Sequence, residues 1–86
     1  MSQPEILVVD DDEAVRQLLC VALPHYGFNA IVAGSGAEAV ALYRLHHDFI
    51  NLVLLDVQMS PLDGPQTLAS LREINPHVRA IFYVRS

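Results

Sequence analysis

The 86-residue sequence predicts one α/β domain, in which helices cover both faces of a doubly wound parallel sheet. Two observations predict this class. Segments with strand character alternate with segments of helix character along the whole chain, in the order βαβαβαβ. Two of the strand segments, residues 6–9 and 52–55, are uninterrupted aliphatic runs, as found in strands that are buried on both faces.

The first strand, residues 6–9, is followed by a helix. Residues 11–13 are all acidic, and negative side chains are favourable at the positive end of a helix. Pro24 and Gly27 are expected to end this helix. Its apolar stripe has the spacing i, i+3, i+4 and i+7 and consists of Val15, Leu18, Leu19 and Ala22.

A second strand is expected over residues 28–33, and a second helix follows it to about His46. Ser35 and Glu38 have the spacing of a capping box, in which two side chains bond the unpaired backbone N–H groups at the start of a helix. The helix therefore begins just after Ser35. The side chains expected to face the core are Ala39, Val40 and Tyr43.

The third strand, residues 52–55, leads into a loop over residues 59–64. Pro65 suits the first position of a third helix, because its fixed φ is helical and its missing N–H would have no partner there. An Asn-Pro pair at 75–76 ends the helix. Its stripe consists of Leu68, Leu71 and Ile74. A fourth strand is expected over residues 80–84.

Composition excludes several function classes. The net charge is −5, and the five basic residues are scattered arginines, which argues against nucleic-acid binding. No apolar run approaches the roughly 20 residues that span a bilayer. Cys20 is the single cysteine, so no internal disulfide can form, and the N-terminus lacks the basic start of a secretory signal. We therefore expect a cytoplasmic protein.

Carboxylates follow the two aliphatic runs. Asp10 and Asp11 come directly after the first strand, and Asp56 comes directly after the third. In an open α/β sheet, ligands bind outside the carboxyl ends of the strands. If the two strands are parallel neighbours, the three carboxylates meet and repel one another unless a hard divalent cation neutralises them. The sequence therefore predicts a Mg²⁺ site at this edge.

The motifs at these residues resemble those of the receiver domain of bacterial two-component response regulators. They are Ile-Leu-Val-Val-Asp-Asp at 6–11, Leu-Val-Leu-Leu-Asp-Val-Gln-Met at 52–59 and Leu-Asp-Gly at 62–64. The resemblance implies a flavodoxin-like fold with the strand order 2-1-3-4, of which the fifth strand and the last helices are missing. It also implies that residues 1–86 form a single receiver domain, truncated at its C-terminus.

The resemblance implies a phosphoacceptor rather than an enzyme. Asp56 would take a phosphoryl group from the phosphohistidine of a histidine kinase or of a histidine phosphotransfer protein. Mg²⁺ would be bound directly by Asp11, Asp56 and the backbone carbonyl of Gln58, with Asp10 acting more through water. Phosphoryl transfer needs such a cation to neutralise the equatorial oxygens.

The chain departs from the family at residues that contact the phosphoryl group. Val84 stands where similar proteins have Ser or Thr at the end of the fourth strand, and Ser86 lies two residues further on. The family's lysine has no counterpart, because the chain contains none. The proline of the loop is shifted by one, to Pro61. Metal binding is compatible with these changes, whereas phosphoryl capture and switching are expected to suffer.

Two alternatives follow. The first is a phosphorylation-incompetent pseudo-receiver or fragment that acts only as a protein-interaction module. The second, more remote, is a phosphatase like the haloacid dehalogenases, with Asp10 as nucleophile and Asp12 as general acid. In addition, the fourth strand is apolar and has no expected neighbour on one side, so we expect self-association through that edge.

Overall fold

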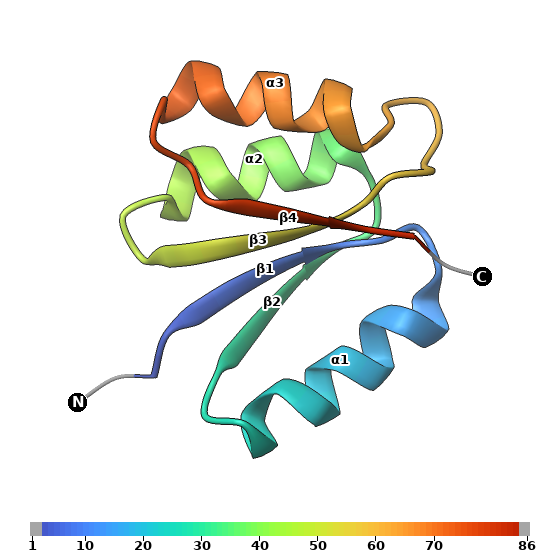
Figure 1. Ribbon diagram of the computed structural model, residues 1–86, viewed down its shortest axis with the longest axis vertical. Coiled ribbons are helices and arrows are strands. Elements are labelled where there is room, and N and C mark those ends of the chain that lie inside the picture. The colour runs from blue at the N-terminus through green and yellow to red at the C-terminus, as the bar shows by residue number, and fades with distance from the viewer. Residues whose placement is uncertain (1–2, 85–86) are drawn as a thin grey trace.

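The computed structural model describes residues 3–84, which form four strands and three helices. The elements are β1 (Glu5–Val9), α1 (Glu13–His25), β2 (Asn29–Ala33), α2 (Gly36–His46), β3 (Ile50–Asp56), α3 (Gly64–Ile74) and β4 (Ala80–Tyr83). The strands form one sheet in the order β2-β1-β3-β4, and every neighbouring pair is parallel (Figure 1). The predicted class and strand order are confirmed.

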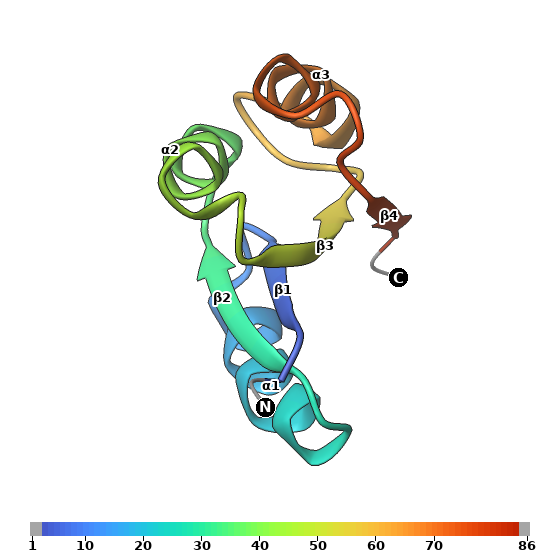
Figure 2. The same cartoon turned by 90° about the vertical axis from the view of Figure 1, so that its left-hand side faces the viewer.

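The helices lie in two layers. In both views α1 lies on one face of the sheet, and α2 and α3 lie together on the other (Figures 1 and 2). The two central strands carry the core: in β1 the four residues Ile6–Val9 are buried, and in β3 Val53 and Leu55 are fully buried. Strands covered on both faces need apolar side chains at successive positions, which explains the aliphatic runs.

Helix α1 differs from its prediction at its C-terminal end. Pro24 lies inside the helix instead of ending it, and α1 continues to His25. The backbone N–H groups of Tyr26 and Gly27 bond the carbonyls of Leu23 and Pro24, which tightens the last turn. Gly27 has φ +87°, a conformation that favours glycine, and it terminates the helix as predicted.

The predicted stripe of α1 is wrong at Leu18, whose side chain is 64% exposed. Val15, Leu19 and Ala22 are half-buried, and no residue of α1 is fully covered. The reason is the position of the helix. It packs against β1 and β2, at one side of the sheet, so that only a narrow part of its surface is covered (Figure 2).

Ser35 is confirmed as the N-cap of α2, which is one half of the predicted capping box, and the prediction for α3 is incomplete. The Ser35 hydroxyl accepts a hydrogen bond from the Glu38 backbone N–H at 3.1 Å. Helix α3 begins at Gly64, one residue before the predicted Pro65, because Asp63 is its N-cap. Asp63 and Gln66 form a reciprocal capping box, with bonds of 2.8 and 3.0 Å. The first turn of α3 is therefore fixed beside the end of β3.

The strands also differ from their predicted boundaries, and β1 begins at Glu5 rather than at residue 6. The second strand begins at Asn29 rather than at residue 28, and β3 is longer than predicted, reaching from Ile50 to Asp56. Strand β4 ends at Tyr83, so that Val84 lies outside it. The β3–β4 register pairs Asp56 with Tyr83. Within residues 3–84, no helix is both long and apolar enough to cross a bilayer.

Candidate functional site

Asp10 directly follows β1 and is fully buried, with 0% of its surface exposed. Its backbone N–H bonds the Ala33 carbonyl at the end of β2. Its carboxylate is bonded on both oxygens: Oδ1 accepts from the Asp12 backbone N–H at 2.8 Å, and Oδ2 accepts from the Tyr83 hydroxyl at 2.6 Å. These bonds compensate for the burial of a group that would otherwise be costly to remove from water.

Asp56 is the last residue of β3 and is also fully buried. Its Oδ1 accepts a hydrogen bond from the Gln58 backbone N–H at 3.0 Å. Val9 of β1 is paired with Leu55 of β3. Asp10 and Asp56 directly follow these two residues and therefore lie at the same edge of the sheet. Parallel pairing of the two aliphatic runs thus places both carboxylates together, as predicted.

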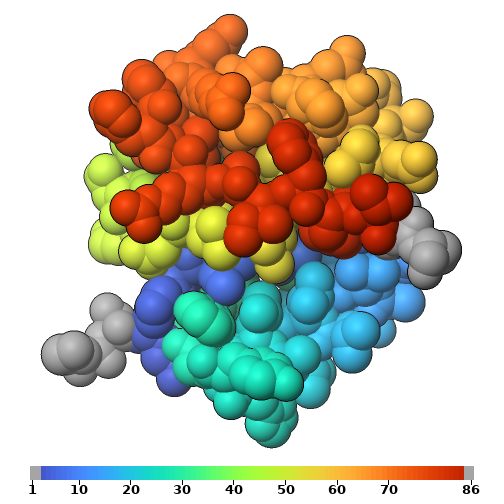
Figure 3. Space-filling model, viewed as in Figure 1, coloured from blue at the N-terminus to red at the C-terminus, as the bar shows by residue number. Residues whose placement is uncertain are grey.

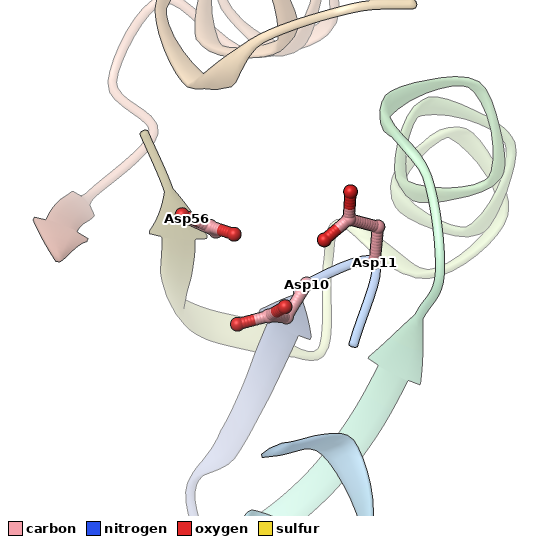
Figure 4. A group of neighbouring side chains, drawn as sticks. All are labelled: Asp10, Asp11 and Asp56. Carbon is pink, nitrogen blue, oxygen red and sulfur yellow. The ribbon is translucent and has the colours of Figure 1, made fainter. Parts of the chain in front are cut away.

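Asp11 completes the cluster from the segment that follows β1. Asp10, Asp11 and Asp56 each offer a carboxylate oxygen, and these three atoms lie within 4.8 Å of one another (Figure 4). Asp11 is exposed, so the cluster reaches the surface there. Oxygen donors this close suit a hard divalent cation such as Mg²⁺, which would neutralise their mutual repulsion. The residues present therefore fit the ion that the sequence predicts.

Gln58 lies beside this cluster through its backbone. Its N–H orients Asp56, and its side chain is exposed. The role of its carbonyl as a metal ligand stays a prediction. Asp12, in contrast, belongs to α1: its side chain accepts from the Ala14 backbone N–H at 2.9 Å and caps the helix.

Two residues at the cluster were not predicted. Tyr83 donates to the Asp10 carboxylate from β4, and the Arg16 guanidinium donates to the Asp10 backbone carbonyl at 2.8 Å. Arg16 could have been suspected, since it lies on the first helix just after the acidic run. Tyr83 carries no comparable signal, because its contact depends on how β4 is aligned with β3.

The departures from the receiver motifs in the described residues fall after β4 and in the loop between β3 and α3. Val84 is exposed just after β4 and has no hydroxyl. Ser86 lies outside the described residues. In the β3–α3 loop Met59 is buried in the core, and the Ser60–Pro61 peptide bond is cis.

Gly64 is required by close approach at this loop. A Cβ at Gly64 would lie 2.7 Å from the backbone carbonyl oxygen of Asp56, a contact that a β-carbon does not tolerate. Gly64→Ala is therefore expected to displace the start of α3 from β3 and to lower the free energy of unfolding by about 1–3 kcal/mol. Urea denaturation measures this change. Ala69→Ser, at an exposed position of α3, should change it by less than about 0.5 kcal/mol; equal effects would contradict the contact.

Comparison with known proteins identifies the family. The model of the response regulator receiver domain matches residues 6–86. The probable transcriptional regulator ycf27 of Cyanophora paradoxa is 38% identical over 73 residues, which are 85% of this chain and 30% of that protein. The transcriptional regulatory protein ZraR of Escherichia coli is 38% identical over 74 residues, which are 86% of this chain and 16% of that protein. The chain thus spans less than a third of these curated relatives.

Solved structures agree with this match. A response regulator receiver domain protein from Clostridium thermocellum superposes with a TM-score of 0.90 at 26% identity, over 98% of this chain and 65% of that one. The CheX–CheY–BeF3–Mg²⁺ complex from Borrelia burgdorferi gives a TM-score of 0.82 at 35% identity, over 93% of this chain and 60% of that one. The chain therefore belongs to the response regulator receiver domain family.

Proposed function

We propose that this receiver domain is a phosphoacceptor of a two-component phosphorelay, in which Asp56 takes a phosphoryl group from a histidine kinase or a histidine phosphotransfer protein. The observation that carries the proposal is the position of Asp56, a buried carboxylate at the carboxyl end of β3 with Asp10 and Asp11 beside it. Asp56 ends β3, whereas Asp10 and Asp11 both follow β1, so their convergence is a property of the fold.

In the proposed reaction an oxygen of the Asp56 carboxylate attacks the phosphorus of phosphohistidine. An O–P bond forms, the P–N bond breaks, and the imidazole leaves with the electron pair of that bond. The Gln58 N–H holds the Asp56 carboxylate in one orientation. Asp10, Asp11, Asp56 and the Gln58 carbonyl would hold Mg²⁺, which when bound neutralises charge on the phosphoryl oxygens. The relative crystallised with Mg²⁺ supports the choice of ion.

Phosphorylation is expected to be slow and confined to one site. Val84 has no hydroxyl where similar proteins have Ser or Thr, so one group that contacts the phosphoryl group in those proteins is missing. Incubation with acetyl phosphate, followed over time by intact-mass analysis, should show the gain of a single phosphoryl group that accumulates slowly. Rapid stoichiometric labelling would contradict the importance given to the missing hydroxyl.

A second candidate function is an interaction module that keeps the receiver fold without accepting phosphate. The missing hydroxyl at Val84 favours it, whereas the convergence of the three carboxylates favours the phosphoacceptor. The labelling experiment separates the two, since an interaction module would gain no phosphoryl group while remaining folded by circular dichroism. The phosphatase alternative is not supported, because the Asp12 carboxylate caps α1.

A further inference from the structure

Tyr83 connects the edge strand of the sheet to the acidic cluster. It is the last residue of β4, paired with Asp56 on β3, yet its hydroxyl bonds the carboxylate of Asp10, which follows β1. Strand β3 lies between β4 and β1, so the tyrosine side chain extends across the neighbouring strand to reach the cluster. The contact joins residues 73 positions apart in the sequence.

The geometry of this contact is that of a strong bond. An O–H···O distance of 2.6 Å is typical of a hydroxyl that donates to an ionised carboxylate. The Asp12 backbone N–H holds Oδ1 of Asp10, and the Tyr83 hydroxyl holds Oδ2. A carboxylate bonded on both oxygens cannot turn without losing one of these bonds. The orientation of Asp10 toward Asp11 and Asp56 is therefore fixed from two elements of the fold.

We propose that Tyr83 is a positioning residue of the cation site: its hydroxyl holds Asp10 in the orientation that Mg²⁺ binding needs, and it thereby makes the affinity of the site depend on the docking of β4. The proposal rests on the proposed function, since it assumes that the acidic cluster binds Mg²⁺. Hydrogen-bond partners outside the first coordination shell commonly set metal affinity in this way.

Tyr83→Phe tests the proposal, because it removes the hydroxyl and keeps the ring. Calorimetric titration with Mg²⁺ should show roughly tenfold weaker binding, at the lower end of what the loss of such a partner causes. Tyr26→Phe is the matched control. Tyr26 is 79% exposed at the end of α1, and removing its hydroxyl should leave the Mg²⁺ affinity unchanged. Circular dichroism establishes that each variant is folded under the titration conditions.

A double-mutant cycle separates positioning from a general structural role. If Tyr83 acts through the Asp10 carboxylate, Tyr83→Phe should have no further effect on Mg²⁺ affinity in a chain that already carries Asp10→Asn. Wild-type affinity in Tyr83→Phe, or an equal loss in both backgrounds, would overturn the proposal and leave the cation site standing. Failure of the wild-type chain to bind Mg²⁺ would overturn the cation site itself, and the role of Tyr83 with it.

A second measurement uses only chains that retain Tyr83, so its result does not depend on whether the Tyr83→Phe variant folds. The sequence has no tryptophan and three tyrosines, so tyrosine emission can be observed directly. Saturating Mg²⁺ should change this emission in the wild-type chain and equally in Tyr26→Phe, because the carboxylate that accepts from the Tyr83 hydroxyl gains a cation nearby. Unchanged emission at Mg²⁺ concentrations that saturate the site by calorimetry would overturn the proposal.

Discussion

Replacing Asp11 with alanine is expected to weaken Mg²⁺ binding by more than about tenfold, because affinity for hard cations depends on the number of charged oxygen ligands. Asp11 is the exposed member of the cluster, and its carboxylate oxygen lies within 4.8 Å of those of Asp10 and Asp56. The substitution removes one of three charges without opening a cavity in the core. Calorimetric titration of the wild-type and variant chains gives the two affinities.

Asp48→Ala is the matched control for this titration. Asp48 is an exposed carboxylate just before β3, at the opposite end of the strand from Asp56, and its loss changes the net charge by the same amount. It should leave Mg²⁺ affinity unchanged. Equal affinity in the wild-type and Asp11→Ala chains would show that the carboxylates do not share one ion.

Replacing Phe82 with lysine is expected to shift the chain from self-associated to monomeric. Strand β4 forms one edge of the sheet in the described residues, and its residues lie across the surface of the molecule (Figure 3). Ile81 and Phe82 are 53% and 41% exposed. An apolar edge strand with unpaired backbone groups recruits a further strand, here from a second copy of the chain, and a lysine on the edge opposes such pairing.

Sedimentation velocity at roughly tens of micromolar measures the distribution of species. Phe49→Lys is the control. Phe49 is 69% exposed and directly precedes β3, so this substitution makes the same chemical change at a position outside β4. It should leave the self-association of the wild-type chain intact. A monomeric wild-type chain with a cooperative melt above about 60 °C, the upper part of the usual mesophile range, would refute the prediction.

The parts of the fold that could be predicted are those with a local cause. Strands buried on both faces require continuous aliphatic runs, so β1 and β3 were visible in the sequence, and Asp10 and Asp56 marked their ends. The start of α3 was predicted one residue late, although Asp63 and Gln66 have the spacing of the capping box that the structure contains. The capping box thus predicts the start of α3 more accurately than Pro65 does.

The remaining features depend on packing between distant segments. The exposure of Leu18 follows from the position of α1 at one side of the sheet, which the periodicity of the helix alone cannot reveal. The bond between Tyr83 and Asp10 depends on the register of β4 on β3 and on the reach of a side chain across a strand. No local pattern of sequence encodes either of these arrangements.

Phosphorylation of Asp56 is expected to depend on Mg²⁺, because the cation and the nucleophile are proposed to share one site. The wild-type chain would be incubated with acetyl phosphate in excess Mg²⁺ or in excess chelator, and the modified residue would be located by peptide mass analysis. Asp56 belongs to the same carboxylate cluster as Asp10 and Asp11, so a phosphoryl group should appear on Asp56 in Mg²⁺ and none should appear in chelator. Modification of another residue, or labelling of Asp56 to the same extent in chelator, would contradict this prediction.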